Sequence, residues 1–302
     1  MRVVGFRRSM FAAERERPRV TPIQSQGSLS PIYLIHDLAG HIDCYRDLAS
    51  ALGPDQPVYA LRFLSDPQAF QSLEKLANSY LTDLRAFDPT GPYILGGFSF
   101  GGAVAFEMAR QLEEIGKEVP LVVMIDAWIG VADRKLRSRD QLSILWEKTK
   151  EQGIPFLASK VRNKFVSSAQ KTLHLFLNLA GRIWRGLHLE PPSRVRLALL
   201  EKANLRLLRA YEPRVYRGPV LLAACSRKLD FLRKRDDHFF GWEVLAGQQF
   251  EICAVDAEHM SIMEEPAIRE VAQRIQEKLT APEVSLGPIA LQGEGRESTN
   301  LN

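Results

Sequence analysis

The most restrictive feature of this 302-residue sequence is a regular alternation between short apolar runs and longer stretches with helical periodicity. The apolar runs are continuous, which is typical of strands buried on both faces of a parallel sheet. Strands are predicted at residues 31–36, 57–63, 92–97, 120–128, 219–226 and 250–256, and helices at 45–53, 72–87, 102–116 and 266–279. The pattern predicts an α/β fold, with a mostly parallel central sheet and helices on both faces.

Three segments depart from this alternation. Residues 1–28 are charged and then rich in turn formers, which predicts a basic, flexible leader. Residues 281–302 have no usable period and are predicted to be a disordered tail. Residues 131–212, approximately, contain helical patterns without a convincing strand, so we expect a helical insertion within one domain that spans residues 29–280.

Composition narrows the class of protein. No apolar run reaches the roughly 18 residues that a membrane-spanning helix needs, and the basic start lacks the continuous apolar core of a secretory signal. Cys44, Cys225 and Cys253 are widely spaced and match no metal-ligand pattern. These features favour a cytoplasmic protein with reduced thiols and without a bound metal.

The five residues Gly97-Phe98-Ser99-Phe100-Gly101 lie between a predicted strand and a predicted helix. A tight turn there would lift Ser99 above the sheet edge, and the flanking glycines would leave room for it. The backbone amide of Phe100 would then be able to donate to a developing oxyanion. A plain glycine-rich turn would look similar, but the strand before it and the helix after it favour a catalytic nucleophile.

A serine nucleophile needs a base, and the base needs a carboxylate that orients it. His259 follows the last predicted strand and precedes the last predicted helix, whereas the other histidines precede Ser99 or lie in or near the insertion. Asp126 ends the strand after the serine's helix, and Asp230 follows the next strand. The chain order Ser, acid, His permits both aspartates.

A second oxyanion donor is expected in the loop after an early strand. The stretch "IHDLAGHIDCYRDLA" fits, because a turn of small residues joins a strand to a helix, and the backbone amide of Leu38 is the candidate donor. Apolar side chains flank the predicted triad and are candidates to line an acyl site, although core packing explains them nearly as well. They are Phe98, Phe100, Trp128 and Met260.

Four blocks together resemble the thioesterase domains of nonribosomal peptide synthetases, polyketide synthases and fatty acid synthases. They are "HDLAGHIDCYRDLASALGPDQPVYAL", "YLTDLRAFDPTGPYILGGFSFGGAVAFEMARQL", "VVMIDAW" and "AEHMSIMEEP", in that order, and the resemblance covers residues 29–280. It implies an α/β-hydrolase fold, and it selects Asp126 over Asp230 as the acid. The chain departs from the family's usual His-Pro at one point, where it has His36-Asp37.

The resemblance also implies a reaction. Ser99 would attack an acyl, polyketide or peptide thioester on the 4'-phosphopantetheine arm of a carrier protein, with His259 as base. Water or an internal nucleophile would then release an acid or a ring. The protein would need no cofactor of its own, because the arm belongs to the partner. A general carboxylesterase or lipase with the same triad, and a catalytically dead acyl-binding or docking module, remain as alternatives.

A basic segment lies inside the insertion. Residues 152–189 contain no acidic residue and six cations, namely Lys160, Arg162, Lys164, Lys171, Arg182 and Arg185. The resemblance implies that this segment is a lid over the acyl site. Its charge fits a solvated outer face, electrostatic steering of an acidic carrier protein, or weak contact with an anionic membrane. Nucleic acid is disfavoured, because stacking aromatics are not interleaved with the cations.

Overall fold

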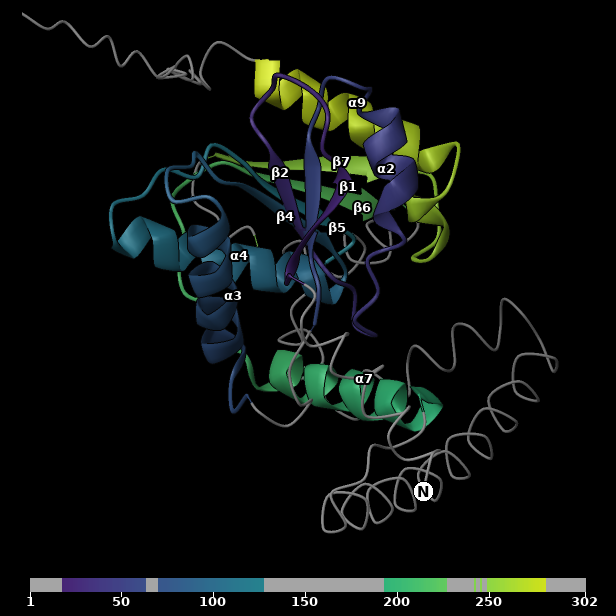
Figure 1. Ribbon diagram of the computed structural model, residues 1–302. Coiled ribbons are helices and arrows are strands. Elements are labelled where there is room, and N and C mark those ends of the chain that lie inside the picture. Colours follow the sequence, from purple (N-terminus) through teal and green to yellow (C-terminus); the bar gives the residue numbers. More distant parts are fainter. Residues whose placement is uncertain are drawn as a thin grey trace, which may run out of the picture.

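The computed structural model describes residues 18–63, 70–127, 193–226, 242, 245 and 249–280. In these residues seven strands form one mixed sheet in the order β1-β3-β2-β4-β5-β6-β7 (Figure 1). The strands are β1 (Val20–Gln24), β2 (Ile32–Ile35), β3 (Val58–Leu61), β4 (Ile94–Phe98), β5 (Val122–Ile125), β6 (Val220–Cys225) and β7 (Phe250–Val255). Only β1 runs antiparallel to its neighbour, which confirms the predicted mostly parallel sheet.

Helices cover both faces of the sheet. They are α2 (Tyr45–Ala51), α3 (Leu73–Phe87), α4 (Phe100–Glu114), α7 (Ser193–Ala210) and α9 (Ala267–Thr280), with a short 3-10 helix η3 (Ser261–Met263) before α9. Helices α3 and α4 pack together on one face, and α2 and α9 pack together on the other (Figure 1). Helix α7 lies beyond the first pair and contacts both α3 and α4.

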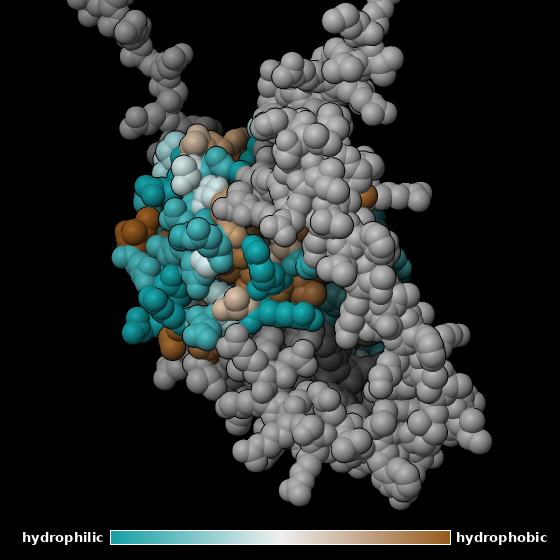
Figure 2. All heavy atoms as spheres, turned by 90° about the horizontal axis from the view of Figure 1, so that it is seen from below, coloured by the Kyte–Doolittle hydropathy of each residue, from teal (hydrophilic) through white to brown (hydrophobic). Residues whose placement is uncertain are grey.

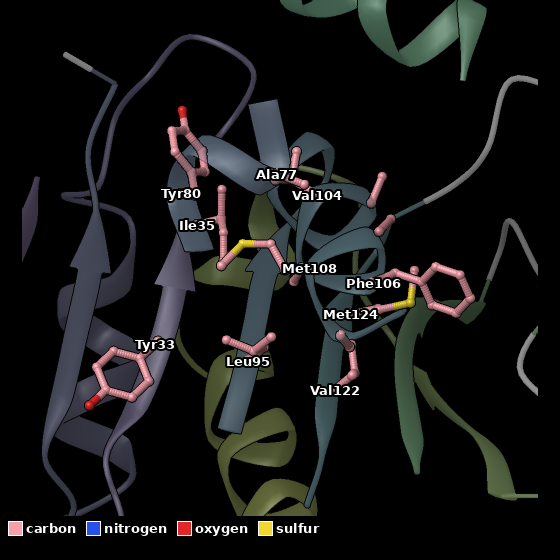
Figure 3. Close-up of a cluster of buried hydrophobic side chains, with 14 of the residues drawn as sticks. Tyr33, Ile35, Ala77, Tyr80, Leu95, Val104, Phe106, Met108, Val122 and Met124 are labelled. Carbon is pink, nitrogen blue, oxygen red and sulfur yellow. The ribbon is translucent and has the colours of Figure 1, made fainter. Parts of the chain in front are cut away.

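The continuous apolar strands are explained by two hydrophobic cores, one on each face. Tyr33 and Ile35 of β2 belong to the core under α3 and α4, whereas Ile32 and Leu34 belong to the core under α2 and α9. Figure 3 shows the first core, in which side chains of β2, β4 and β5 meet those of α3 and α4. Strands β2, β4, β5 and β6 thus bury successive residues in opposite cores, so neither face of these strands is polar.

The surface is consistent with this burial. Seen from below, the described part of the surface is mainly hydrophilic, and its hydrophobic residues form separate patches (Figure 2). Within the described ranges, no helix combines the length and the apolar character needed to cross a membrane.

The prediction of a flexible leader over residues 1–28 is wrong for residues 20–24. These residues form β1, which pairs antiparallel with β3 at the edge of the sheet. The side-chain amide of Gln24 also donates to the carbonyls of Gly53 and Gln56, at 2.7 Å each. The polar composition and Pro22 concealed the strand, but proline is tolerated on an edge strand, and the register shifts between Pro22 and Gln24.

The remaining predictions about the ends and the insertion are tested only in part. The first 17 residues, the predicted tail and most of the predicted lid, including the basic segment 152–189, lie outside the described residues. Helix α7 falls inside the predicted insertion and is helical, as expected there.

The sheet has a topological switch point between β2 and β4. From β2 the chain moves outward to β3, and it then returns to form β4 on the other side of β2. Connections that leave neighbouring parallel strands in opposite directions open a crevice at the carboxyl ends of those strands, where ligands bind in open α/β sheets. Ile35 of β2 is opposite Gly97 of β4, so the loop after β2 and Ser99 after β4 lie at this crevice.

Close backbone contact joins these two elements. A Cβ atom at Gly101 would lie 2.7 Å from the carbonyl oxygen of His36 and closer still to that of Ile35. A Cβ at Gly97 would lie 2.7 Å from the backbone nitrogen of Gly102. Because these neighbours are backbone atoms, they have little freedom to move away. Glycine at 101 therefore allows the start of α4 to rest on the end of β2, and glycine at 97 allows the first turn of α4 to lie against β4.

We expect Gly101→Ala to lower the free energy of unfolding by about 3 kcal/mol, because its methyl group would overlap the backbone of β2. Gly116→Ala is a matched control: Gly116 has φ +68° but open space around its Cβ position, so only the backbone cost of about 1 kcal/mol applies. Urea unfolding measures both. Equal losses in the two variants would contradict the close approach described here.

Candidate active site

Ser99 lies at the sharp turn between β4 and α4. Its backbone has φ 53° and ψ −113°, a conformation that a residue with a side chain rarely adopts. The turn is held by two bonds: the Ser99 amide donates to the carbonyl of Ile125 at 2.8 Å, and the Gly102 amide donates to the carbonyl of Ser99 at 3.2 Å. Ser99 is partly exposed although the residues on both sides of it are buried. The turn thus presents the serine at the carboxyl edge of the sheet.

The amide of Phe100 is the first of helix α4. Because it precedes the first helical hydrogen bond, it has no acceptor within the helix. Among the described residues, no acceptor is bonded to it. It is therefore available to an anion beside Ser99, and the dipole of the 15-residue helix favours negative charge there.

Asp126 and His259 are brought together from positions 133 residues apart. Asp126 follows β5, is 1% exposed and has φ 41°. Its amide donates to the carbonyl of Ala223 at 2.7 Å, and its Oδ2 lies 2.5 Å from Nδ1 of His259. The Cys225 amide contributes a longer bond of 3.4 Å to Oδ1. Each oxygen of the buried carboxylate thus has a donor, as burial of a charge requires.

This contact sets the tautomer of His259. A carboxylate oxygen can only accept a hydrogen bond, so the proton lies on Nδ1 of the ring. In the neutral imidazole, Nε2 then carries a free lone pair and is able to take a proton. The His259 side chain is 39% exposed, so the base is also accessible from the crevice.

Phe98 places His259 beside the turn. The two rings stack with centroids 4.8 Å apart and an interplanar angle of 29°. Phe98 is 3% exposed and directly precedes Ser99 in the chain. The imidazole is therefore supported from below by the residue next to the candidate nucleophile.

The loop after β2 is organised by Asp37. Oδ1 of Asp37 accepts hydrogen bonds from the amides of Ala39 and His41, at 2.9 and 2.8 Å. Its own amide donates to the His41 carbonyl, and its carbonyl accepts from the Gly40 amide, each at 3.0 Å. Aspartate commonly caps its own loop in this way. Asp37 therefore holds the loop with side-chain hydrogen bonds, at the position after His36 where the family named by the sequence resemblance usually has proline.

These bonds account for every loop amide except that of Leu38. The amides of Asp37, Ala39, Gly40 and His41 all have acceptors within the loop. The Leu38 amide has no acceptor among the described residues. The candidate second oxyanion donor is thus the one amide of residues 37–41 that has no acceptor in the described part of the chain.

His36 supports the same loop from below. It is fully buried, its Nδ1 lies 2.6 Å from the Asp37 carbonyl, and its Nε2 lies 2.5 Å from the Tyr80 hydroxyl. Burial lowers the pKa of His36 to about 4, so the ring is neutral at pH 7. Since a carbonyl only accepts, Nδ1 carries the proton, and Nε2 accepts from the Tyr80 hydroxyl. The guanidinium of Arg19, which directly precedes β1, lies over the Tyr80 ring, 4.8 Å from its centroid.

The structure brings some predicted residues together and leaves others untested. Asp126 and His259 are hydrogen-bonded, and Phe98 packs against His259 directly before Ser99. Ser99, Phe100 and Leu38 follow the carboxyl ends of the neighbouring strands β4 and β2. Met260 is 68% exposed, and Phe100 is buried in the core. Trp128 and the alternative acid Asp230 lie outside the described residues. A role for Phe98, Trp128 or Met260 in binding an acyl chain stays a prediction.

Sequence reasoning missed several supporting residues. The Tyr45 hydroxyl donates to the Ile35 carbonyl and accepts from the Phe98 amide at 2.9 Å, so it ties the end of β2 to the end of β4. Asn204 of α7 donates to the Leu38 carbonyl at 2.9 Å. The cap at Asp37 carries a local signal, an aspartate followed by small residues. Neither Tyr45 nor Asn204 carries one, because their partners are distant in sequence.

Comparison with known proteins identifies the family. The sequence model of the family described as "Thioesterase domain" matches residues 30–279. The chain is also similar to the NocB thioesterase domain from the nocardicin cluster, with 23% identity and a TM-score of 0.60, over 88% of this chain and 100% of that one. That domain shares the α/β-hydrolase fold with this chain.

Two curated relatives are much longer proteins. Malpinin synthetase from Mortierella alpina is 29% identical over 261 residues, which are 85% of this chain and 3% of the synthetase. The protein named inactive atromentin synthetase invA6 from Paxillus involutus is 36% identical over 129 residues, which are 42% of this chain and 13% of that protein. The chain therefore spans only a small part of the synthetases that it matches.

The buried His36 predicts how stability depends on pH. Its pKa is about 4 in the folded protein and 6.5 when unfolded, so only the unfolded chain gains a proton between these values. The contribution of His36 to stability is full above pH 6.5 and is lost as the pH falls towards 4, by about 3 kcal/mol. We expect the stability advantage of wild type over His36→Phe, measured by urea unfolding, to shrink by that amount over this interval. A constant advantage would show that His36 titrates normally.

Proposed function

The chain belongs to the thioesterase domain family, and we propose that it is a serine thioesterase that releases an acyl, polyketide or peptide chain from a carrier protein. The observation that carries the proposal is the hydrogen bond between the buried carboxylate of Asp126 and Nδ1 of His259. This bond leaves Nε2 free, on a ring that stacks against the neighbour of Ser99. The arrangement provides a base for a serine hydroxyl that is otherwise a poor nucleophile.

In the first step Ser99 Oγ attacks the carbonyl carbon of the thioester. Its proton passes to Nε2 of His259, and the positive imidazolium that results is stabilised by Asp126. The carbonyl oxygen becomes an oxyanion. The tetrahedral intermediate then collapses, the carbon–sulfur bond breaks, and the departing sulfur takes the proton from His259. The products of this half-reaction are a free carrier thiol and an acyl ester on Ser99.

The oxyanion would be bound by the amides of Leu38 and Phe100. Both amides lack a protein acceptor among the described residues, and they belong to segments in backbone contact through Gly101. Fixed donors at the position where charge develops stabilise the transition state more than the ground state. Helix α4 adds its positive N-terminal end at the same place.

In the second step a nucleophile attacks the acyl ester of Ser99. His259 removes a proton from water, or from a hydroxyl or amine of the acyl chain itself, and returns it to Ser99 Oγ. Water yields a free acid, whereas an internal nucleophile yields a ring. The same three side chains and two amides serve both outcomes, so the choice depends on the acyl chain and on the residues that enclose it.

A carrier protein is the proposed source of the acyl group. The curated relatives are long synthetases of which this chain matches a small part, which is consistent with one domain that works beside others. On this proposal the 4'-phosphopantetheine arm and its thiol belong to the carrier. The chain's own contribution is the nucleophile, the base and the oxyanion donors.

Two other functions make different predictions. A general carboxylesterase or lipase would use the same triad on a freely diffusing ester, and it would show no rate advantage for carrier-bound acyl groups. A catalytically dead acyl-binding module would leave Ser99 unlabelled by a fluorophosphonate in the folded protein. One relative carries the word "inactive" in its name, so this comparison is worth making directly.

We expect intact-protein mass spectrometry to detect an acyl adduct on Ser99 after exposure to acyl-loaded carrier proteins, and Ser99→Ala to form none.

Asp126→Asn should lower kcat by about 10⁴-fold, because an amide favours the wrong tautomer of His259 while keeping the shape of the site. Asp88→Asn is a matched control, because Asp88 accepts hydrogen bonds from the amides of the loop before β4. This loop precedes Ile94, the first residue of β4, and so lies at the amino ends of the strands, away from Ser99.

Full turnover by the Ser99→Ala protein would refute the proposal. An adduct on another residue would also refute the assignment of the nucleophile. A large rate advantage for the carrier-bound acyl group over the same acyl group as a free ester would favour the thioesterase over the general esterase.

A further inference from the structure

The peptide group between Leu38 and Ala39 is held at both ends. Its carbonyl oxygen, on Leu38, accepts a hydrogen bond from Nδ2 of Asn204 at 2.9 Å. Its amide, on Ala39, donates to Oδ1 of Asp37 at 2.9 Å. One anchor belongs to the loop itself, and the other comes from helix α7, 166 residues further along the chain.

The preceding peptide group is anchored only through its carbonyl. The Asp37 carbonyl accepts from Nδ1 of His36 and from the Gly40 amide. The amide at the other end of this group is that of Leu38. In a trans peptide the N–H points away from the C=O, so anchoring the carbonyl sets the direction of the Leu38 amide. Leu38 therefore sits between two fixed peptide groups, and its own N–H has no acceptor among the residues that the structure describes.

Residues of helix α7 contact this loop directly. Asn204 is 1% exposed, so its amide group is committed within the protein. Leu200 lies one helical turn earlier on the same side, and a Cβ at Gly40 would come within 2.6 Å of its Cδ2. The end of α7 is tied to α4, because the Tyr211 hydroxyl donates to Oε2 of the buried Glu107 at 2.8 Å. The loop, α7 and the nucleophile's helix are thus linked.

We propose that Asn204 and Asp37 are positioning residues that fix the Leu38 amide as an oxyanion donor, an inference that rests on the proposed function. Without Asn204, the Leu38–Ala39 peptide would be held only through its amide, by Asp37, and its carbonyl would no longer be kept turned away from the site of the oxyanion. A carbonyl oxygen facing the developing oxyanion would repel it. Asn204 therefore acts on catalysis through the loop, and Asp37 replaces with two hydrogen bonds the rigidity that a proline would give.

The test compares variants that differ in one hydrogen-bonding property. Asn204→Asp keeps the shape of the side chain but removes the donor, and Asn204→Ala removes the side chain. Asp37→Asn keeps an oxygen that accepts both amide bonds, whereas Asp37→Ala keeps none. Asn78→Asp is the matched control for Asn204, because Asn78 is exposed on α3. Asp88→Ala is the control for Asp37, because Asp88 also accepts from two loop amides, those of Thr90 and Gly91.

The readouts are kcat and KM for an acyl-N-acetylcysteamine thioester, with the thermal midpoint of each variant as a measure of folding. We expect Asn204→Asp, Asn204→Ala and Asp37→Ala to lower kcat by about 10- to 100-fold, with KM changed by less than about threefold. Asp37→Asn should retain kcat within about threefold. Asp88→Ala should lower the thermal midpoint without lowering kcat.

Two results would overturn the inference. One is a folded Asn204 variant, either Asp or Ala, with the kcat of wild type. The other is an equal loss in Asp37→Asn and Asp37→Ala, which would show that the charge of Asp37 matters and its acceptor geometry does not. Failure of the proposed function is distinct, because wild-type protein would then form no adduct on Ser99 at all.

Discussion

The site depends on the backbone contact between the start of α4 and the end of β2. Gly101 lies against the carbonyls of Ile35 and His36, with no space for a side chain between them. This contact brings the turn that carries Ser99 beside the loop that carries Leu38. The sheet topology makes the contact possible, because β2 and β4 are neighbours whose connections leave in opposite directions. Ser99 and both candidate oxyanion donors therefore lie at the same edge of the sheet as a consequence of the fold.

Around this contact, hydrogen bonding determines which polar groups remain available. Asp126 occupies Nδ1 of His259, and Asp37 occupies the amides of Ala39 and His41. Within the described ranges, Nε2 of His259 and the backbone amides of Leu38 and Phe100 have no bonded partner. These are the groups that proton transfer and oxyanion binding require. The buried, neutral His36 also fixes this loop, because its Nδ1 donates to the Asp37 carbonyl without bringing a charge into the core.

The sequence predicted the parallel sheet and its helices because strands and helices have different apolar periods, and burial on both faces makes that signal strong. Chain order and loop position also pointed to Ser99 and His259, but they left Asp126 and Asp230 open as the acid, and the resemblance to the thioesterase domains selected Asp126. Two features were beyond reach for a physical reason. Strand β1 contains Pro22 and polar residues, and its pairing with β3 is fixed by tertiary contact. Asn204 carries no local pattern, because its partner lies 166 residues away.

The central claim is that the fold leaves the Leu38 and Phe100 amides free to bind an oxyanion beside Ser99. Amide ¹H–¹⁵N spectra before and after reaction with a fluorophosphonate test it, because the phosphoryl oxygen on Ser99 stands in for the oxyanion. We predict that the Leu38 and Phe100 amide protons move downfield on reaction, while those of Ala39 and His41, already bonded to Asp37, stay nearly unchanged. Unmoved Leu38 and Phe100 signals on a phosphonylated Ser99 would contradict the account.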